Sequence, residues 1–160
     1  MTTQQMTSHP TDDAALAEHL KEHHSAMVTQ LDRLSSALQR PADHAAAVST
    51  RAALSKWLAT VLIPHAAAEE KTSYRAADQL PAGHALITAM LMEHVLIRRL
   101  AELFETSLGA EAAAAYARAL FEVFECHQRV ENHIIFPLLV ADPSVSLVEV
   151  MSGHADDDHH

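Results

Sequence analysis

The chain has 160 residues, 49% of them apolar, which suits one domain with a core of its own. With only three glycines and frequent Ala, Leu and Glu, the composition favours packed helices over a sheet or a disordered chain. A net charge of −10 disfavours nucleic acid or an anionic membrane as a partner, and a single cysteine excludes an internal disulfide and a cysteine-based zinc site.

The first ten residues are polar and lack the apolar run of a signal peptide. No apolar stretch approaches the ~20 residues that a membrane span needs. The sequence therefore predicts a cytoplasmic protein without a membrane partner. We expect residues 1–10 to form a flexible N-terminal lead, and residues 154–160, which are rich in Asp and His, to form a disordered tail.

Four long segments carry apolar residues at the three- and four-residue spacing of amphipathic helices. They cover residues 11–40, about 42–74, 84–107 and 111–136. Pro64 should kink the second helix just before His65, and Pro137 should end the fourth. The short connections predict an all-α, up-down-up-down antiparallel four-helix bundle over residues 11–140, with a short extra helix within 141–153.

Two fragments of the sequence repeat one pattern, His65-Ala-Ala-Ala-Glu69 and His127-Gln-Arg-Val-Glu131. Residues four apart lie one above the other on a helix, so each pair directs an imidazole and a carboxylate at the same point. A single His-x3-Glu pair carries little information. Two of them, on the second and fourth predicted helices, indicate a shared site.

A lone histidine lies on the apolar side of the helix before each pair. In the third helix it is His94. In the first helix the apolar periodicity leaves both His23 and His24 possible, because they lie on either side of the centre of the stripe. The neighbours favour His24, whose apolar residues four before and three after match those of His94. His23 would then flank the site.

Six polar side chains facing a core need partners, since an unpaired buried polar group costs on the order of 1–3 kcal/mol and an isolated carboxylate far more. Two metal ions would satisfy them, and carboxylates can bridge two cations. Imidazole and carboxylate without thiolate favour non-haem iron or manganese over structural zinc. The Glu-x2-His motif of ferritin-like bundles is absent. The predicted ligands are His24, His65, Glu69, His94, His127 and Glu131.

With these groups in this order, one per helix, the chain resembles the hemerythrin-like (HHE cation-binding) domains over about residues 14–140. The resemblance implies a cofactor of two iron ions, a di-iron centre with an oxo or hydroxo bridge, in which Glu69 and Glu131 are the bridging carboxylates. It implies a protein that binds or reacts with a small ligand (oxygen, nitric oxide or peroxide) for sensing or detoxification. Alternatives are catalase-like or nitric oxide-reducing turnover at the same site, and iron storage without turnover. Enzymatic activity and oligomeric state therefore stay open.

The chain departs from the oxygen-carrying hemerythrins at two places. Met90 stands where the third helix of those proteins carries the first histidine of a His-x3-His pair. On the fourth helix Glu131 comes one residue earlier than their aspartate, and Asn132 occupies the aspartate position. The missing histidine predicts open positions on the irons, which favours reaction with the small ligand over reversible oxygen carriage.

Residues outside the set of six carry ordinary expectations. Tyr74 should be a packing residue, Met92 a core filler and Cys126 a buried small hydrophobe. Leu108 should continue the apolar stripe of the third helix. Glu70 should lie at the surface or beside the ligands, and His19, near a helix start, should be solvated.

Overall fold

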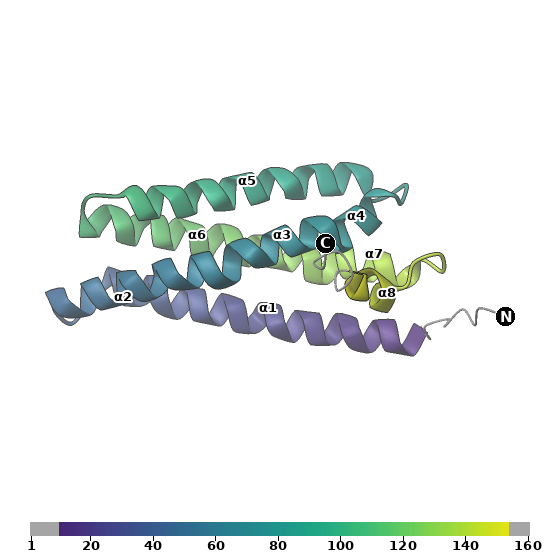
Figure 1. Ribbon diagram of the computed structural model, residues 1–160, viewed down its shortest axis with the longest axis horizontal. Helices are drawn as coiled ribbons and strands as arrows, with labels where there is room; N and C mark the ends of the chain where they lie inside the picture. The colour runs from purple at the N-terminus through teal and green to yellow at the C-terminus, as the bar shows by residue number, and fades with distance from the viewer. Residues whose placement is uncertain (1–9, 154–160) are drawn as a thin grey trace, which may run out of the picture.

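The computed structural model describes residues 10–153, and within that range the chain forms helices and turns without a strand (Figure 1). The expected flexible lead and disordered tail fall on residues 1–9 and 154–160, outside the described range. Two of the helical segments, η1 and η2, are π-helical. In chain order the elements are α1 (Pro10–Gln39), α2 (His44–Trp57), η1 (Leu58–Leu62), α3 (Ile63–Lys71), α4 (Ser73–Asp78), α5 (His84–Thr106), α6 (Ala110–Val130), η2 (Glu131–Ile135), α7 (Phe136–Ala141) and α8 (Leu147–Ser152).

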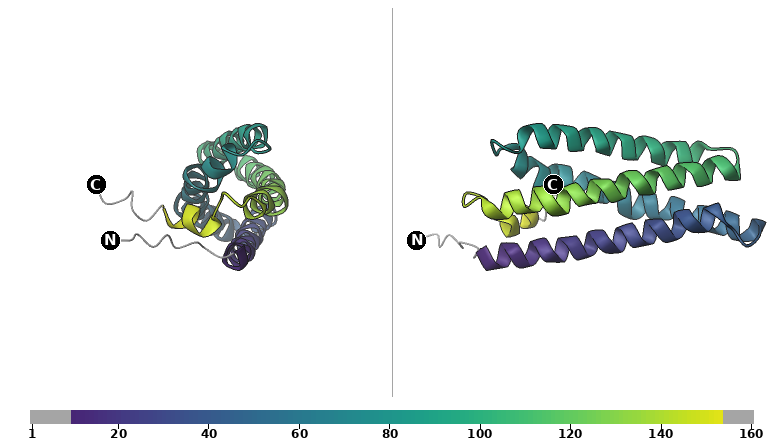
Figure 2. Two further views of the ribbon diagram at one scale, coloured as in Figure 1. Left: turned by 90° about the vertical axis from the view of Figure 1, so that its right-hand side faces the viewer. Right: turned by 180° about the vertical axis from the view of Figure 1, so that it is seen from behind.

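The long helices lie side by side around a common axis, as the end-on view in Figure 2 shows. Helix α1 packs against α2 and α6, and α5 packs against α6. The short helix α8 lies against α1 and α4, where its buried Leu147 joins the core. The all-helical fold agrees with the expectation from composition. Within residues 10–153, no helix combines the length and the apolar character needed to cross a lipid bilayer.

The core consists of two apolar clusters separated by a layer of buried polar side chains. On α1, His24 lies between Ala17 of one cluster and Met27 of the other. On α5, His94 lies in the same way between Met90 and Ile97. The larger cluster, the first apolar cluster, includes Met27, Leu31, Leu34, Leu54, Leu62, Ile97, Phe104, Leu120 and Phe124. The second apolar cluster includes Ala17, Tyr74, Ile87, Met90, Ile135, Phe136, Leu139 and Leu147.

The two π-helical segments each end two residues before a proline, at Pro64 and Pro137. A proline ring inside an α-helix removes one hydrogen bond and clashes with the carbonyl four residues earlier. That carbonyl belongs to a π-helical residue in both cases, and the wider π turn makes room for the ring. The helix therefore continues through Pro137 to Ala141, and the prediction that it ends near Pro137 is wrong. At Pro64 the expected distortion takes the form of η1.

The second helix breaks at Thr72, whose backbone angles of φ −117° and ψ −96° are not helical. The Thr72 hydroxyl donates to the carbonyl of Ala68 at 2.8 Å, a side-chain bond that competes with regular helix geometry. The chain restarts as α4 at Ser73, so the prediction of one continuous helix to Tyr74 is wrong. The break places Tyr74 in the buried polar layer.

Three expectations about burial are wrong. Leu108 is fully exposed because α5 ends at Thr106, before the apolar stripe reaches it. Met92 lies on the outer face of α5, two residues along from the buried Met90, and is 71% exposed. Cys126 is exposed on α6. Apolar periodicity located the inner faces of the helices correctly. It did not predict where an apolar stripe ends or whether a single residue beside the stripe is buried.

Candidate metal centre

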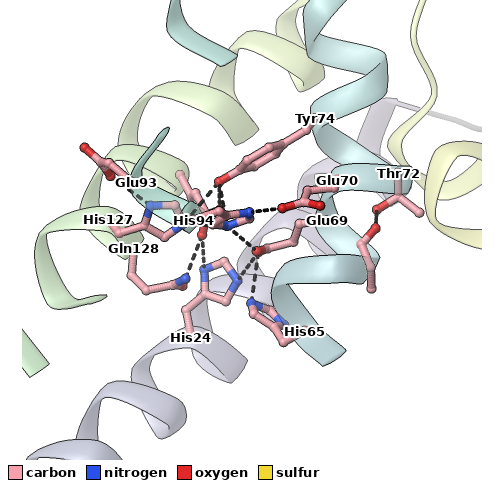
Figure 3. A network of polar contacts seen from close by, with 12 residues as sticks. His24, His65, Glu69, Glu70, Thr72, Tyr74, Glu93, His94, His127 and Gln128 are labelled. Carbon is pink, nitrogen blue, oxygen red and sulfur yellow. Dashed lines mark hydrogen bonds and ion pairs between the residues drawn. The ribbon is translucent and has the colours of Figure 1, made fainter. Parts of the chain in front are cut away.

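The structure brings all six predicted ligands together in the polar layer between the two apolar clusters. Figure 3 labels His24, His65, Glu69, His94 and His127. They form two groups of four, and in each group the ligand atoms lie within 4.8 Å of one another. Glu69 and Glu131 belong to both groups. The first sub-site consists of His24, His65, Glu69 and Glu131, and the second sub-site consists of His94, His127, Glu69 and Glu131.

The position of His24 bears on the choice between adjacent histidines of α1. Its side chain is 1% exposed and its Nε2 lies 3.4 Å from Oε1 of Glu69. His23 is exposed, and its ring lies at the edge of the cluster, 5.5 Å from the ring of His65. The structure therefore brings His24 into the cluster and leaves His23 at its rim.

In the second sub-site the ring nitrogens of two histidines converge. Nε2 of His94 lies 3.0 Å from Nε2 of His127 and 3.6 Å from Oε2 of Glu69. Nε2 of His127 lies 3.2 Å from Oε1 of Glu131. Four candidate ligand atoms from α3, α5, α6 and η2 thus point at one small volume.

The Nδ1 atoms on the far sides of three rings have acceptors. His94 donates to Oε1 of Glu70 at 2.8 Å, and His127 donates to Oε2 of Glu93 at 2.8 Å. The ring of His24 pairs instead with the neutral amide oxygen of Asn132, also at 2.8 Å. Such outer partners fix the ring orientation and tautomer of a metal-binding histidine and raise its basicity. The ring nitrogens that face the cluster are therefore the ones left free to bind a cation.

These outer partners were only partly foreseen from the sequence. Glu70 was expected at the surface or beside the ligands, and the structure places it beside the ligand His94. Arg98 also donates to Glu70, at 2.7 Å. The roles of Glu93 and Asn132 were missed. Glu93 directly precedes His94 and Asn132 directly follows Glu131 in the sequence. A residue next to a ligand is turned by about 100° around the helix and so faces a neighbouring helix. That position is the sequence signal that could have identified both residues.

Tyr74 is also part of the centre, so the expectation of a simple packing residue is wrong. Its hydroxyl donates to Oε1 of Glu131 at 2.5 Å and lies 3.1 Å from Nε2 of His127. Its ring stacks on His94, with centroids 5.0 Å apart. Burial raises the pKa of Tyr74, and the nearby carboxylates of Glu131 and Glu69 raise it further, so the residue stays a neutral phenol.

The buried carboxylates and imidazoles of the cluster shift one another's pKa values. Burial favours neutral Glu69, but the imidazoles of His24, His65 and His94 outweigh burial and hold the pKa of this carboxyl well below its usual range. Burial likewise opposes charge on His127, yet the carboxylates of Glu131 and Glu93 raise its pKa. The metal-free cluster therefore stabilises a carboxylate anion and attracts positive charge.

Several buried polar atoms lack a partner within the described residues. They include Nε2 of His65 and Oε2 of Glu69. Nε2 of His65 is only 2.9 Å from Oε1 of Glu69, but the two are not aligned as a hydrogen bond. In the second sub-site, the Nδ1 atoms of His94 and His127 are engaged with carboxylates, so their Nε2 lone pairs face each other. A cation in each sub-site would satisfy these four atoms, so the donor set fits a metal centre.

The fold and the site together define a class, a helical bundle with a buried histidine and glutamate cluster suited to metal cations. Residues 15–139 match the family model of the hemerythrin HHE cation binding domain, and the chain belongs to this family. The match confirms the resemblance drawn from the sequence. No curated protein and no solved structure matched the chain.

Proposed function

We propose that this protein is a di-iron hemerythrin-like protein that reacts with a small ligand, oxygen, nitric oxide or peroxide, in sensing or detoxification. The proposed frame is an up-down-up-down four-helix bundle with α8 as an added short helix. The observation that carries the proposal is that two carboxylates, Glu69 and Glu131, are common to two four-ligand groups. Shared carboxylates of this kind hold two metal ions close together, about 3.5–4 Å apart in two-metal sites.

Iron fits the donor set better than structural zinc, since four imidazoles and two carboxylates surround the volume without a thiolate. A pair of ferrous ions would supply electrons to the bound small molecule. The protein would supply an environment of low polarity, since an apolar cluster closes the polar layer on each side. Glu70 and Glu93 would keep the rings of His94 and His127 aimed inward.

The surroundings of Met90 and Tyr74 favour reaction over reversible carriage. Met90 has no nitrogen to offer where the oxygen carriers have a histidine, and it packs in the second apolar cluster near Tyr74. The phenol of Tyr74 points at the second sub-site and can hold a proton there. A proton donor beside a site with fewer ligands suits the reduction of a bound oxygen or nitrogen species. We therefore favour consumption of the ligand over its storage.

Tyr74→Phe tests this role. The variant should bind the same amount of iron as the wild type but consume peroxide more slowly, on the order of 10²-fold, because the proton donor is lost. Tyr116→Phe is the matched control, since Tyr116 is a partly buried tyrosine that packs on the first apolar cluster away from the centre. Iron content and initial rates of peroxide loss measure both effects.

Two outcomes would count against the proposal in different ways. A fully loaded Tyr74→Phe protein that consumes peroxide at the wild-type rate would remove the proton role of Tyr74. Iron-loaded wild-type protein that leaves oxygen, nitric oxide and peroxide unchanged, and shows no spectral response to them, would contradict the reactive function itself.

A further inference from the structure

Among the six candidate ligands, His65 has the most exposed side chain. The side chains of His24, His94 and His127 are each 1% exposed, and Glu131 is equally buried. The side chain of His65 is 15% exposed. A cation that reaches the centre without large helix motions would therefore meet His65 first.

A second histidine covers this exposed edge. The ring of His23 lies 5.5 Å from the ring of His65, centroid to centroid, while its own side chain belongs to the exposed face of α1. His23 also lies within 6.4 Å of the ring of the buried His24. It is thus placed between solvent and the first sub-site, although it is not a member of either four-ligand group.

His19 extends the row of imidazoles away from the centre. It precedes His23 by four residues on α1, and both are exposed. Two histidines at this spacing share one helix face with Cβ atoms about 5–6 Å apart, which lets both rings hold one transition-metal cation. Imidazole pairs are good ligands for divalent first-row metals.

The local charges do not oppose a cation there. Lys21, the basic residue between the two histidines, is paired with Glu18 at 2.6 Å. Glu22 adds an exposed negative charge beside His23. The chain as a whole carries a formal charge of −10, which concentrates cations near its surface.

We propose that His19 and His23 form a surface site for a divalent transition-metal cation, from which the cation passes to His65 and the first sub-site. The surface site rests on the two exposed imidazoles, and the transfer step rests on the proposed function of the centre. The second sub-site would then fill through the shared Glu69 and Glu131.

The test uses the metal-free full chain and the double variant His19→Gln/His23→Gln. Calorimetric titration with Ni²⁺ should show one additional, weaker bound ion in the wild type that the double variant lacks. Under anaerobic conditions, stopped-flow uptake of Fe²⁺ at low concentration should be slower in the double variant by at least about tenfold, because the local cation site is lost. The final iron content should be unchanged.

His44→Gln/His84→Gln is the matched control, since it removes two exposed histidines, on α2 and α5, that belong to neither four-ligand group. It should keep the additional Ni²⁺ ion and the wild-type uptake rate. The inference is wrong if the variant His19→Gln/His23→Gln still binds the additional Ni²⁺ ion. It is also wrong if this variant takes up iron at the wild-type rate with normal final loading. Either result leaves the proposed function intact. Failure of the wild type to load iron overturns both.

Discussion

Glu131→Gln should leave the protein with one tightly bound metal ion or none, whereas we expect two in the wild type. Glu131 belongs to both four-ligand groups, so its charge is lost from both sub-sites at once. Glu69→Gln/Glu131→Gln removes every carboxylate of the six-ligand set and should abolish tight binding. Elemental analysis after anaerobic iron loading and desalting measures both variants. Two retained ions in Glu131→Gln would show that this carboxylate is not shared.

The substitution to glutamine separates loss of metal from loss of fold. Glutamine has nearly the same shape as glutamate. His127, whose pKa Glu131 raises, can lose its proton once the carboxylate is gone, so no unpaired charge stays buried. Gln128 and Tyr74 can still reach the new side chain, because both contact the carboxylate of Glu131. The metal-free variant should therefore melt close to the metal-free wild type. Glu122→Gln, at an exposed glutamate on α6, is the control and should keep both ions.

Metal loading should raise the melting temperature of the wild type. A ligand that binds only the native state adds about 2.7 kcal/mol at a free concentration one hundred times Kd. For a domain of this size each kcal/mol corresponds to roughly 2–4 °C, so the shift should be on the order of 5–10 °C. Part of the gain comes from satisfying buried atoms such as Nε2 of His65 and Oε2 of Glu69.

Thermal melts followed by circular dichroism, with iron and then with excess chelator, measure this shift. The Glu69→Gln/Glu131→Gln variant should show no change on loading, which separates binding at the centre from binding elsewhere on the chain. A wild-type melting temperature that is the same with iron and with chelator would mean that the polar layer is a metal-free scaffold.

The six clustered residues could be predicted from local spacing and, for His24, from its sequence neighbours. His65 and Glu69 are four apart, as are His127 and Glu131, and helix geometry places such pairs on one face. His94 continues an apolar stripe, so its burial followed from periodicity. Periodicity did not separate His24 from His23, and the choice rested on the match between the neighbours of His24 and those of His94. The order of these groups along the chain, one per helix, then indicated the family that the match over residues 15–139 confirms.

Tyr74 could not be found in this way, because its position depends on a break in the helix. The sequence around Thr72 lacks glycine and proline, so the helical pattern predicted a second helix that continues past this residue. The hydrogen bond from Thr72 to Ala68 and the restart at α4 appear only in the folded chain. Glu93 was missed for a related reason, since its partner His127 lies on another helix, 34 residues away.

The π-helical segments were also beyond the sequence pattern. A proline in a helical pattern predicts a kink or an end, and the sequence does not state which. At Pro64 and Pro137 the chain forms neither a simple kink nor a helix end, but a π-helical turn that is followed by further helix. The two segments lie differently relative to the ligands, because η1 precedes His65 and η2 contains Glu131. The two halves of the bundle therefore differ in detail although their ligand patterns repeat.

The proposal that the polar layer binds two iron ions can be tested by measuring the iron content of the wild-type protein. The metal-free chain is loaded with excess Fe²⁺ under anaerobic conditions, passed through a desalting column and assayed for iron per chain. We expect two ions per chain, retained through the column. Iron that washes away to the level of Glu69→Gln/Glu131→Gln would contradict it.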